Sequence, residues 1–214
     1  LATLPVDAMR TPLGLVEVDR EAASALRGLP SIAPNELAHA AEHSLEVQLP
    51  FLQHVLGDFS VVPIVVGDAS DEEVAEVIEC LWGGPETLFV VSSDLSHYYD
   101  DATARQLDAR TCRAIESCDP EALDQESACG RVPVRGLLRV ARRHGLEIHT
   151  LDLRNSGDTA GSRDSVVGYG AWAFVDSAAS QRAGSDLRSP DSEAEAEAET
   201  ESDAQLLELA RRSI

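Results

Sequence analysis

Two side chains able to carry chemistry stand close together in the stretch LFVVSSDLSHYYDD (residues 88–101). Asp94 and His97 follow an apolar segment and are three positions apart, which places carboxylate and imidazole on one side of a helical turn. A carboxylate so placed fixes the tautomer of the histidine and raises its basicity, which suits a general base or the surroundings of a metal ion. The alternative is that Ser93 or Asp94 only caps the next helix.

A second histidine lies in EHSLE (42–46), where His43 and Glu46 would share one face of a helix. Pro50 interrupts this helical pattern, and its ring clashes with the carbonyl group four residues earlier, so we expect a kink or two abutting helices there. A kinked helix is suited to lining a cavity. A solvated helix face is the alternative explanation of the same spacing.

Cys129, in ACGRVP (128–133), directly precedes a helix that we expect to start at Pro133. A helix N-terminus with Arg131 alongside favours the thiolate, which acts as a nucleophile or as a ligand for a soft metal ion. The alternative is a small buried apolar side chain, the commoner role of cysteine. None of the three stretches identifies a site by itself.

The elements that must position these residues alternate between strands and helices, which predicts an α/β layered fold. Open α/β sheets place their sites beyond the carboxyl ends of strands, which is where Asp94 and His97 fall. The expected strands cover 14–18, 60–67, 87–93, 146–153 and 165–175. The expected helices follow Asp19, cover 40–56, follow a capping box of Ser70 and Glu73, run through 107–118, start at Pro120, and run from Pro133 to Gly145.

The domain organisation follows from a change of composition after Val175. Residues 1–175 are expected to form one α/β domain. Residues 176–202 are dominated by Ser, Ala, Glu and Asp, which predicts an acidic, disordered linker. Residues 203–214 restart an amphipathic helix, as at the opening of a second domain. The chain begins with Leu close to a strand-like segment, so we expect it to be a fragment.

The charge of the chain is strongly negative, with 38 acidic residues against 17 basic ones and a net charge of −21. All the basic residues are arginine. An acidic surface without lysine suits a salt-rich cytoplasm and indicates halophilic adaptation. It argues against nucleic-acid binding, which requires clustered basic residues. The four cysteines form no C-x-x-C pair, which favours reduced thiols in a cytoplasmic protein, and no apolar run is long enough to span a membrane.

Six stretches, taken in order, resemble the Memo family, the B component of the archaeal and bacterial AmmeMemoRadiSam system. EHSLEVQLPFL followed by LFVVSSDLSHY is the most specific pair among them. The resemblance covers essentially all of residues 1–175. The matching stretches are DAMRTPLG (7–14), EHSLEVQLPFL (42–52), VVPIVVG (61–67), LFVVSSDLSHY (88–98), CGRVPVRGLL (129–138) and DSVVGYGAWAF (164–174).

The resemblance implies a fold similar to the class III extradiol (LigB-like) dioxygenases, with a mixed, largely parallel central sheet flanked by helices and a non-haem metal site. It implies that Cys129 is a thiolate ligand of an iron or copper ion, with Asp94 and His97 as catalytic residues beside it. His97 would act as acid and base toward a catechol-type substrate. His43 and Ser93 would be pocket residues.

This sequence also departs from the family pattern. The two histidine ligands of the family lie in an N-terminal segment, one in a Pro-His-Ala-Gly-Tyr stretch, and neither occurs here, so only one of the expected ligands is retained. Val132 stands where some members have histidine. Residues 203–214 resemble the first helix of an AMMECR-type domain, a frequent fusion partner of the family.

Three functions remain open from the sequence. The first is a metal-dependent redox enzyme of unknown substrate, in which a thiolate replaces the carboxylate of the usual 2-His-1-carboxylate triad. The second is a non-catalytic binding or scaffold module that uses the same cleft for a small molecule, a peptide, or an AMMECR-type or radical SAM partner. The third, a hydrolase using Ser92 or Ser93 with His97, lacks the G-x-S-x-G elbow.

Overall fold

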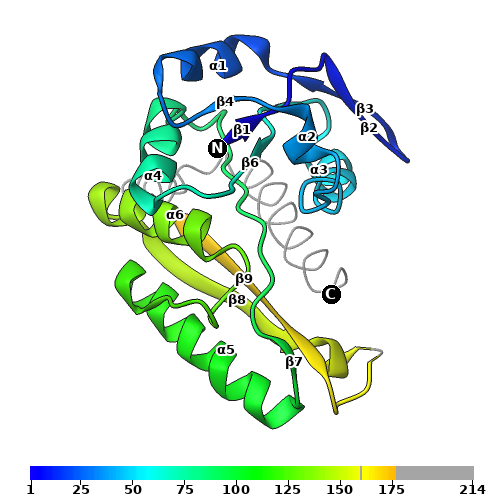
Figure 1. Cartoon of the computed structure of the whole chain (residues 1–214), viewed down its shortest axis with the longest axis vertical. Coiled ribbons are helices and arrows are strands. Elements are labelled where there is room, and N and C mark those ends of the chain that lie inside the picture. Colours follow the sequence, from blue (N-terminus) through cyan, green and yellow to red (C-terminus); the bar gives the residue numbers. More distant parts are fainter. Residues whose placement is uncertain (160, 177–214) are drawn as a thin grey trace, which may run out of the picture. The chain divides into compact units, whose positions relative to one another are not determined.

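The computed structural model describes residues 1–159 and 161–176 (Figure 1). The predicted linker and terminal helix lie outside the described residues. Contacts divide the described chain into two compact units. The first comprises Leu1–Ser93 with Val132–Val140, and the second comprises Asp94–Arg131 with the described residues from Ala141 onward.

Two small sheets form in the first unit, each with three strands. One has the order β4 (Ala33–Pro34), β1 (Ala2–Thr3), β6 (Ile64–Val65), and the other has the order β2 (Ala8–Thr11), β3 (Gly14–Val18), β5 (Ser60–Val61). The strand expected at 14–18 is therefore confirmed.

The expected continuous strand 60–67 is wrong, because the segment forms two short strands that join different sheets. β5 pairs in parallel with β3, whereas β6 pairs antiparallel with β1. Pro63 lies between them and is fully buried. Proline has no N–H to donate to a strand ladder, so the pairing is interrupted where the chain passes from one sheet to the other.

Helices of the first unit begin where the sequence predicts a cap. Asp19 accepts the Ala22 N–H at the start of α1 (Arg20–Ala25), which leads into the 3-10 turn η1 (Leu26–Gly28). Ser70 and Glu73 form the predicted capping box of α4 (Asp71–Cys80). Both predictions are confirmed, since a cap needs only partners within a few residues along the chain.

The kinked helix expected over residues 40–56 is wrong in its first half. Residues 40–48 form turns after the short helix α2 (Glu36–His39), and α3 covers only Leu49–Leu56. Pro50 lies in the first turn of α3. A first-turn N–H has no partner within the helix, so proline costs nothing there and starts the helix instead of bending it.

Residues 87–93, expected to be a buried strand, form no strand. No strand pairing forms along this segment among the described residues, and the side chains of Leu88 and Val90 are 64% and 46% exposed. A run of apolar residues indicates strand preference, but a strand also needs a neighbour to accept its hydrogen bonds. The next strand along the chain is β7, which begins at His97.

The second unit contains a three-stranded antiparallel sheet in the order β7 (His97–Tyr99), β9 (Val166–Val175), β8 (Glu147–Asn155). The two long strands confirm the predictions for 146–153 and 165–175. Helix α5 (Asp101–Glu116) packs against β8 and β9. The 3-10 turns η2 (Pro120–Ala122) and η3 (Ser156–Asp158) complete the unit (Figure 1).

Helix α6 (Arg131–His144) runs from the second unit into the first and back. Its start lies two residues before the predicted Pro133, and it ends as predicted at Gly145, which has a φ of 65°. That left-handed conformation is open to glycine without strain, so Gly145 terminates the helix. Leu138 and Val140 on this helix are fully buried.

The mixed α/β character of the fold is confirmed, but the expected largely parallel central sheet is not present among the described residues. These form three separate sheets, in which only the pairs β1–β4 and β3–β5 run parallel. The strand expected at 87–93, directly before Asp94, does not form among the described residues.

We expect Gly136→Ala to destabilise the protein, although alanine favours a helix by about 1 kcal/mol over glycine. A Cβ on Gly136 would lie 2.5 Å from Cγ1 of Val74 in α4 and 3.0 Å from the carbonyl oxygen of Asp71. Overpacking of this kind costs about 1–3 kcal/mol, so the clash outweighs the gain in helix propensity. Urea unfolding measures the difference. In a Val74→Gly background, which removes both Val74 carbons that the new Cβ would meet, the same substitution should cost less, and an equal loss in both backgrounds would contradict the clash.

Asp71 should stabilise the protein in a pH-dependent way. Its carboxylate accepts hydrogen bonds from Arg135 Nε at 3.0 Å and Arg139 Nε at 2.9 Å. Burial acts to raise the pKa of Asp71, but the hydrogen bond and charge of Arg139 and the charge of Arg135 outweigh it and lower that pKa below its usual value. Because the pKa of Asp71 is lower in the folded protein, the carboxylate stabilises the fold at pH values above the unfolded-state pKa of about 4. This stabilisation is lost as the pH falls through the lower, folded-state pKa.

Asp71→Asn should therefore reduce the free energy of unfolding at about pH 7, and the difference from wild type should shrink as the pH falls below about 4. Urea titrations across this range measure it. Asp58→Asn, which removes an exposed carboxylate, is the matched control for net charge. A destabilisation by Asp71→Asn that is the same at every pH would contradict the role of the carboxylate charge.

Candidate metal centre

The candidate centre lies on the segment from Asp94 to His97, which leads into β7 and is held along β9 of the second unit. Leu95 N donates to the Gly168 carbonyl oxygen at 2.9 Å, and Gly168 N donates to the Ser96 carbonyl oxygen at 2.8 Å. His97 then pairs with Val167 in the sheet. The segment is thus fixed by main-chain hydrogen bonds to a long strand.

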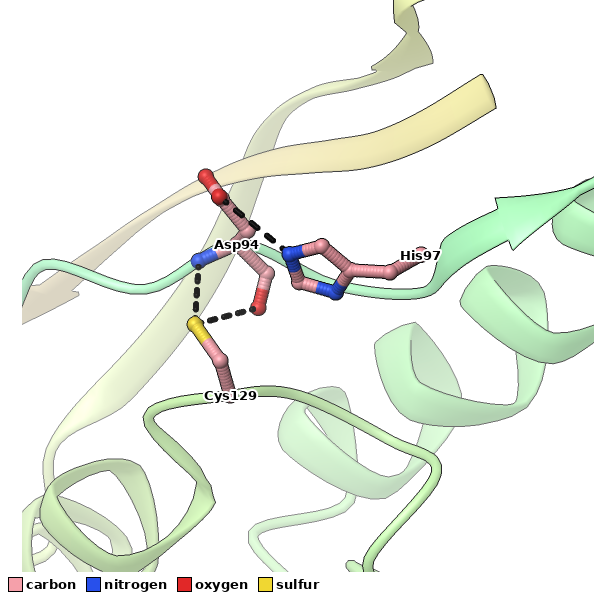
Figure 2. A group of neighbouring side chains, drawn as sticks. All are labelled: Asp94, His97 and Cys129. Carbon is pink, nitrogen blue, oxygen red and sulfur yellow. Dashed lines mark hydrogen bonds and ion pairs between the residues drawn. The ribbon is translucent and has the colours of Figure 1, made fainter. Parts of the chain in front are cut away.

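Cys129 lies directly before Gly130, the N-cap of α6. It contacts Asp94 through its main chain and its sulfur (Figure 2). Asp94 N donates to Cys129 Sγ at 3.3 Å, and Cys129 N donates to the Asp94 carbonyl oxygen at 3.3 Å. Cys129 Sγ also lies 3.7 Å from that carbonyl oxygen, within reach of its S–H. Two parts of the chain 35 residues apart are therefore joined at the level of the backbone.

The imidazole of His97 turns toward the carboxylate of Asp94, with Nε2 3.5 Å from Oδ2 (Figure 2). The sequence predicts this pairing, but through a turn of helix, and that part is wrong. His97 is the first residue of β7, and the pairing register shifts between His97 and Tyr99, where Tyr98 has a φ of 65°. Residues three apart in a regular strand face opposite sides, so the irregular backbone of 94–96 is what brings the two together.

One donor atom from each of Asp94, His97 and Cys129 lies within 4.8 Å of the other two. Ligands bound to one transition-metal ion at about 2.0–2.3 Å are separated by roughly 3–4 Å, so a small adjustment of side chains would suffice. The cluster is also accessible, because the side chains of His97 and Asp94 are 32% and 48% exposed. Sulfur, nitrogen and oxygen donors together suit a transition metal better than Mg²⁺ or Ca²⁺, which prefer oxygen alone.

The sequence prediction missed a buried carboxylate under this segment. Asp108 on α5 is 3% exposed, and its Oδ1 accepts the Ser96 N–H at 3.0 Å. Burial raises its pKa, against the lowering effects of the Ser96 hydrogen bond and the charge of His97. The helical spacing from Ala104 through Asp108 to Thr111 was the available signal, because it puts an acid on the buried face.

Tyr169 on β9 is a second residue that the motifs did not indicate. Burial is the larger cause that raises the pKa of its phenol, and the negative charge of Asp94 raises it further. The phenol of Tyr169 is thus within electrostatic range of the cluster.

The roles of His43 and Ser93 stay predictions. Both belong to the first unit, His43 in the turns before α3 and Ser93 at the residue that precedes Asp94 in the chain. The shared helical face expected for His43 and Glu46 is wrong, because residues 42–46 are not helical. Instead, Glu42 accepts the N–H groups of His43 and Ser44, both at 2.8 Å.

Among the described residues, no helix has the length and apolar character that crossing a membrane requires. The described residues include all four cysteines, and no disulfide joins them.

The fold and the site define a mixed α/β protein with a sulfur, nitrogen and oxygen cluster at the start of one strand and before one helix. The family model for Memo-like proteins matches residues 1–173. The chain belongs to the Memo family, which confirms the resemblance in the sequence.

Three MEMO1 family proteins illustrate the similarity. The chain is 35% identical to one from Methanosarcina barkeri over 182 residues, which is 79% of this chain and 68% of the relative. It is 37% identical to one from Archaeoglobus fulgidus over 179 residues, covering 78% and 68% of the two chains. It is 40% identical to one from Aeropyrum pernix over 175 residues, covering 76% and 62%.

We expect Asp94→Asn to lower the pKa of Tyr169, because the substitution removes a nearby negative charge while burial still keeps the pKa above its usual value. Ultraviolet absorbance of the phenolate measures the titration, in a Tyr98→Phe, Tyr99→Phe background that leaves one tyrosine. Asp164→Asn, at an exposed position before β9, is the control and should leave the titration unchanged. An unaltered Tyr169 titration in Asp94→Asn would show that the two groups do not interact.

Proposed function

We propose that this Memo-family protein is a metal-dependent oxidoreductase in which Cys129 binds an iron or copper ion and Asp94 and His97 act beside it. The observation that carries the proposal is the convergence of one donor atom from each of these residues within 4.8 Å. A bound ion of this kind would supply Lewis acidity and one-electron chemistry.

Cys129 is the ligand in this proposal. Its sulfur accepts a hydrogen bond from the Asp94 N–H, which holds the sulfur beside Asp94 and His97. The sulfur is held on an exposed residue, so an ion and a substrate reach it from solvent. A thiolate is softer than a carboxylate, which favours iron or copper over the hard cations.

Asp94 and His97 act on the substrate in this proposal. The carboxylate of Asp94 lies 3.5 Å from Nε2 of His97, so it orients the imidazole. A histidine held in this way beside a thiolate is placed to take a proton from a hydroxyl group of a bound substrate and to return it later. The family resemblance adds His43 and Ser93 as pocket residues.

The finer parts of the proposal come from the family resemblance. A LigB-like dioxygenase fold would make a catechol-type compound the first substrate to test. A peptide, or an AMMECR-type or radical SAM protein, would be the partner if the same site serves binding instead of catalysis. The names of the relatives state the family alone and no reaction.

We expect Cys129→Ala to bind ferrous or cuprous ion much more weakly than the wild-type protein. Removing a residue that only hydrogen-bonds to a metal ligand lowers metal affinity by roughly 10–100-fold, and removing the ligand itself should lower it further. Equilibrium titration under anaerobic conditions and metal analysis after gel filtration measure the binding. Cys80→Ala is the matched control, because Cys80 is an exposed cysteine of the other unit. Undiminished binding by Cys129→Ala would refute the ligand assignment.

His97→Ala should keep most of the metal affinity but lose oxygen-dependent turnover, because the imidazole acts on protons and not on the ion. Oxygen uptake with catechol and its simple derivatives measures turnover, with His54→Ala, an exposed histidine, as the control. Loss of the metal in His97→Ala would make His97 a ligand. Metal binding without oxygen uptake in wild type would favour the binding module over the enzyme.

A further inference from the structure

The residue that the proposed chemistry leaves unused is Asp108, a carboxylate buried beneath the segment that carries Asp94 and His97. It is 3% exposed and comes from the buried face of α5. Burying a carboxylate costs free energy unless its hydrogen bonds compensate for it, and burial does raise the pKa of Asp108. An apolar residue at this helix position would avoid that cost.

The hydrogen bond that Asp108 accepts comes from the segment that carries the candidate centre. Its Oδ1 accepts the N–H of Ser96, the residue between the two parts of the centre that lie on this segment. The charge of His97 lowers the pKa of Asp108, which indicates that the imidazole lies within electrostatic range of the buried carboxylate.

Gly168 on β9 completes the arrangement. Its main chain bonds to Leu95 and Ser96, and a Cβ at this position would overlap the carboxylate oxygens of Asp108. Glycine is therefore required for β9 and the buried carboxylate to lie in contact with each other beside this segment.

We propose that Asp108, admitted by Gly168, is a positioning residue that sets the backbone of residues 94–97 and thereby the geometry of the metal centre. The inference rests on the proposed function for its relevance to metal binding. The mechanical link is direct. Asp108 holds Ser96, and the same segment carries Asp94, whose N–H donates to Cys129 Sγ and whose carbonyl oxygen accepts the Cys129 N–H. Asp108 itself touches neither Cys129 nor the ion.

The first test uses the metal-free protein and reads the hydrogen exchange of the Cys129 amide, which donates to the Asp94 carbonyl oxygen. Asp108→Ala and Gly168→Ala should accelerate this exchange by about tenfold, the scale of losing one hydrogen bond. The amide of Arg154, in the long β8–β9 pairing, is the reference and should change far less. Asp108→Asn should behave as wild type, because its amide oxygen still accepts the Ser96 N–H.

The second test uses cobalt(II), whose visible spectrum reports the geometry and the thiolate ligand. Asp108→Ala and Gly168→Ala should alter the bands and weaken cobalt binding by about 10–100-fold, while Asp108→Asn restores both. Thermal unfolding shows that each variant is folded at the temperature of measurement.

The outcomes separate the two proposals. Equal acceleration at Cys129 and Arg154, or none at either, would overturn the positioning role and leave Asp108 as an ordinary buried residue. A wild-type protein that binds no cobalt would overturn the proposed function, whereas the exchange measurement would still decide the role of Asp108. Unchanged cobalt spectra in Asp108→Ala, with cobalt bound by wild type, would also overturn the inference.

Discussion

The reciprocal hydrogen bonds between Asp94 and Cys129 are the constraint on which the candidate centre depends. They join the segment before β7 to the residue before α6, with the Asp94 N–H directed at sulfur and the Cys129 N–H directed at the Asp94 carbonyl. Main-chain groups have few degrees of freedom, so they place a thiol more reproducibly than a contact between two long side chains would. The side chains of Asp94 and His97 then need only ordinary rotamers to face the same point.

This contact is supported from both sides by elements of the second unit. Strand β9 bonds to Leu95 and Ser96 through Gly168, and α5 bonds to Ser96 through Asp108. The long antiparallel pairing of β8 with β9 holds the strand, and α5 packs on both. The site therefore consists of exposed reactive groups on a backbone that is anchored by buried ones, the arrangement that a preorganised centre requires.

The negative charge of the chain bears on the same centre. A protein of net charge −21 attracts cations to its surface in general, so acidic groups by themselves say little about a metal site. The distinguishing feature here is that sulfur and imidazole join one carboxylate, because neither is a common partner for a loosely attracted hard cation. The chemistry of the donors, more than the sum of the charges, makes this cluster different from the rest of an acidic surface.

Local physics accounts for what the sequence by itself determined. The caps at Asp19 and at Ser70 with Glu73, the left-handed end of α6 at Gly145 and the hairpin of β8 and β9 all depend on partners that are near in the chain or on a clear apolar pattern. The motifs were also sufficient to identify the family.

Only the tertiary structure decided which distant segments meet. The apolar run 87–93 has the composition of a strand but forms no strand among the described residues, and the run 60–67 divides at Pro63 between two sheets. Strand pairing depends on neighbouring strands, which the composition of a segment does not specify. In the same way, local patterns indicated Cys129 and Asp94 only as separate candidates, which the family resemblance alone placed beside each other, and neither gave a sign of Asp108. Their meeting depends on a main-chain contact across 35 residues, an interaction that no local pattern encodes.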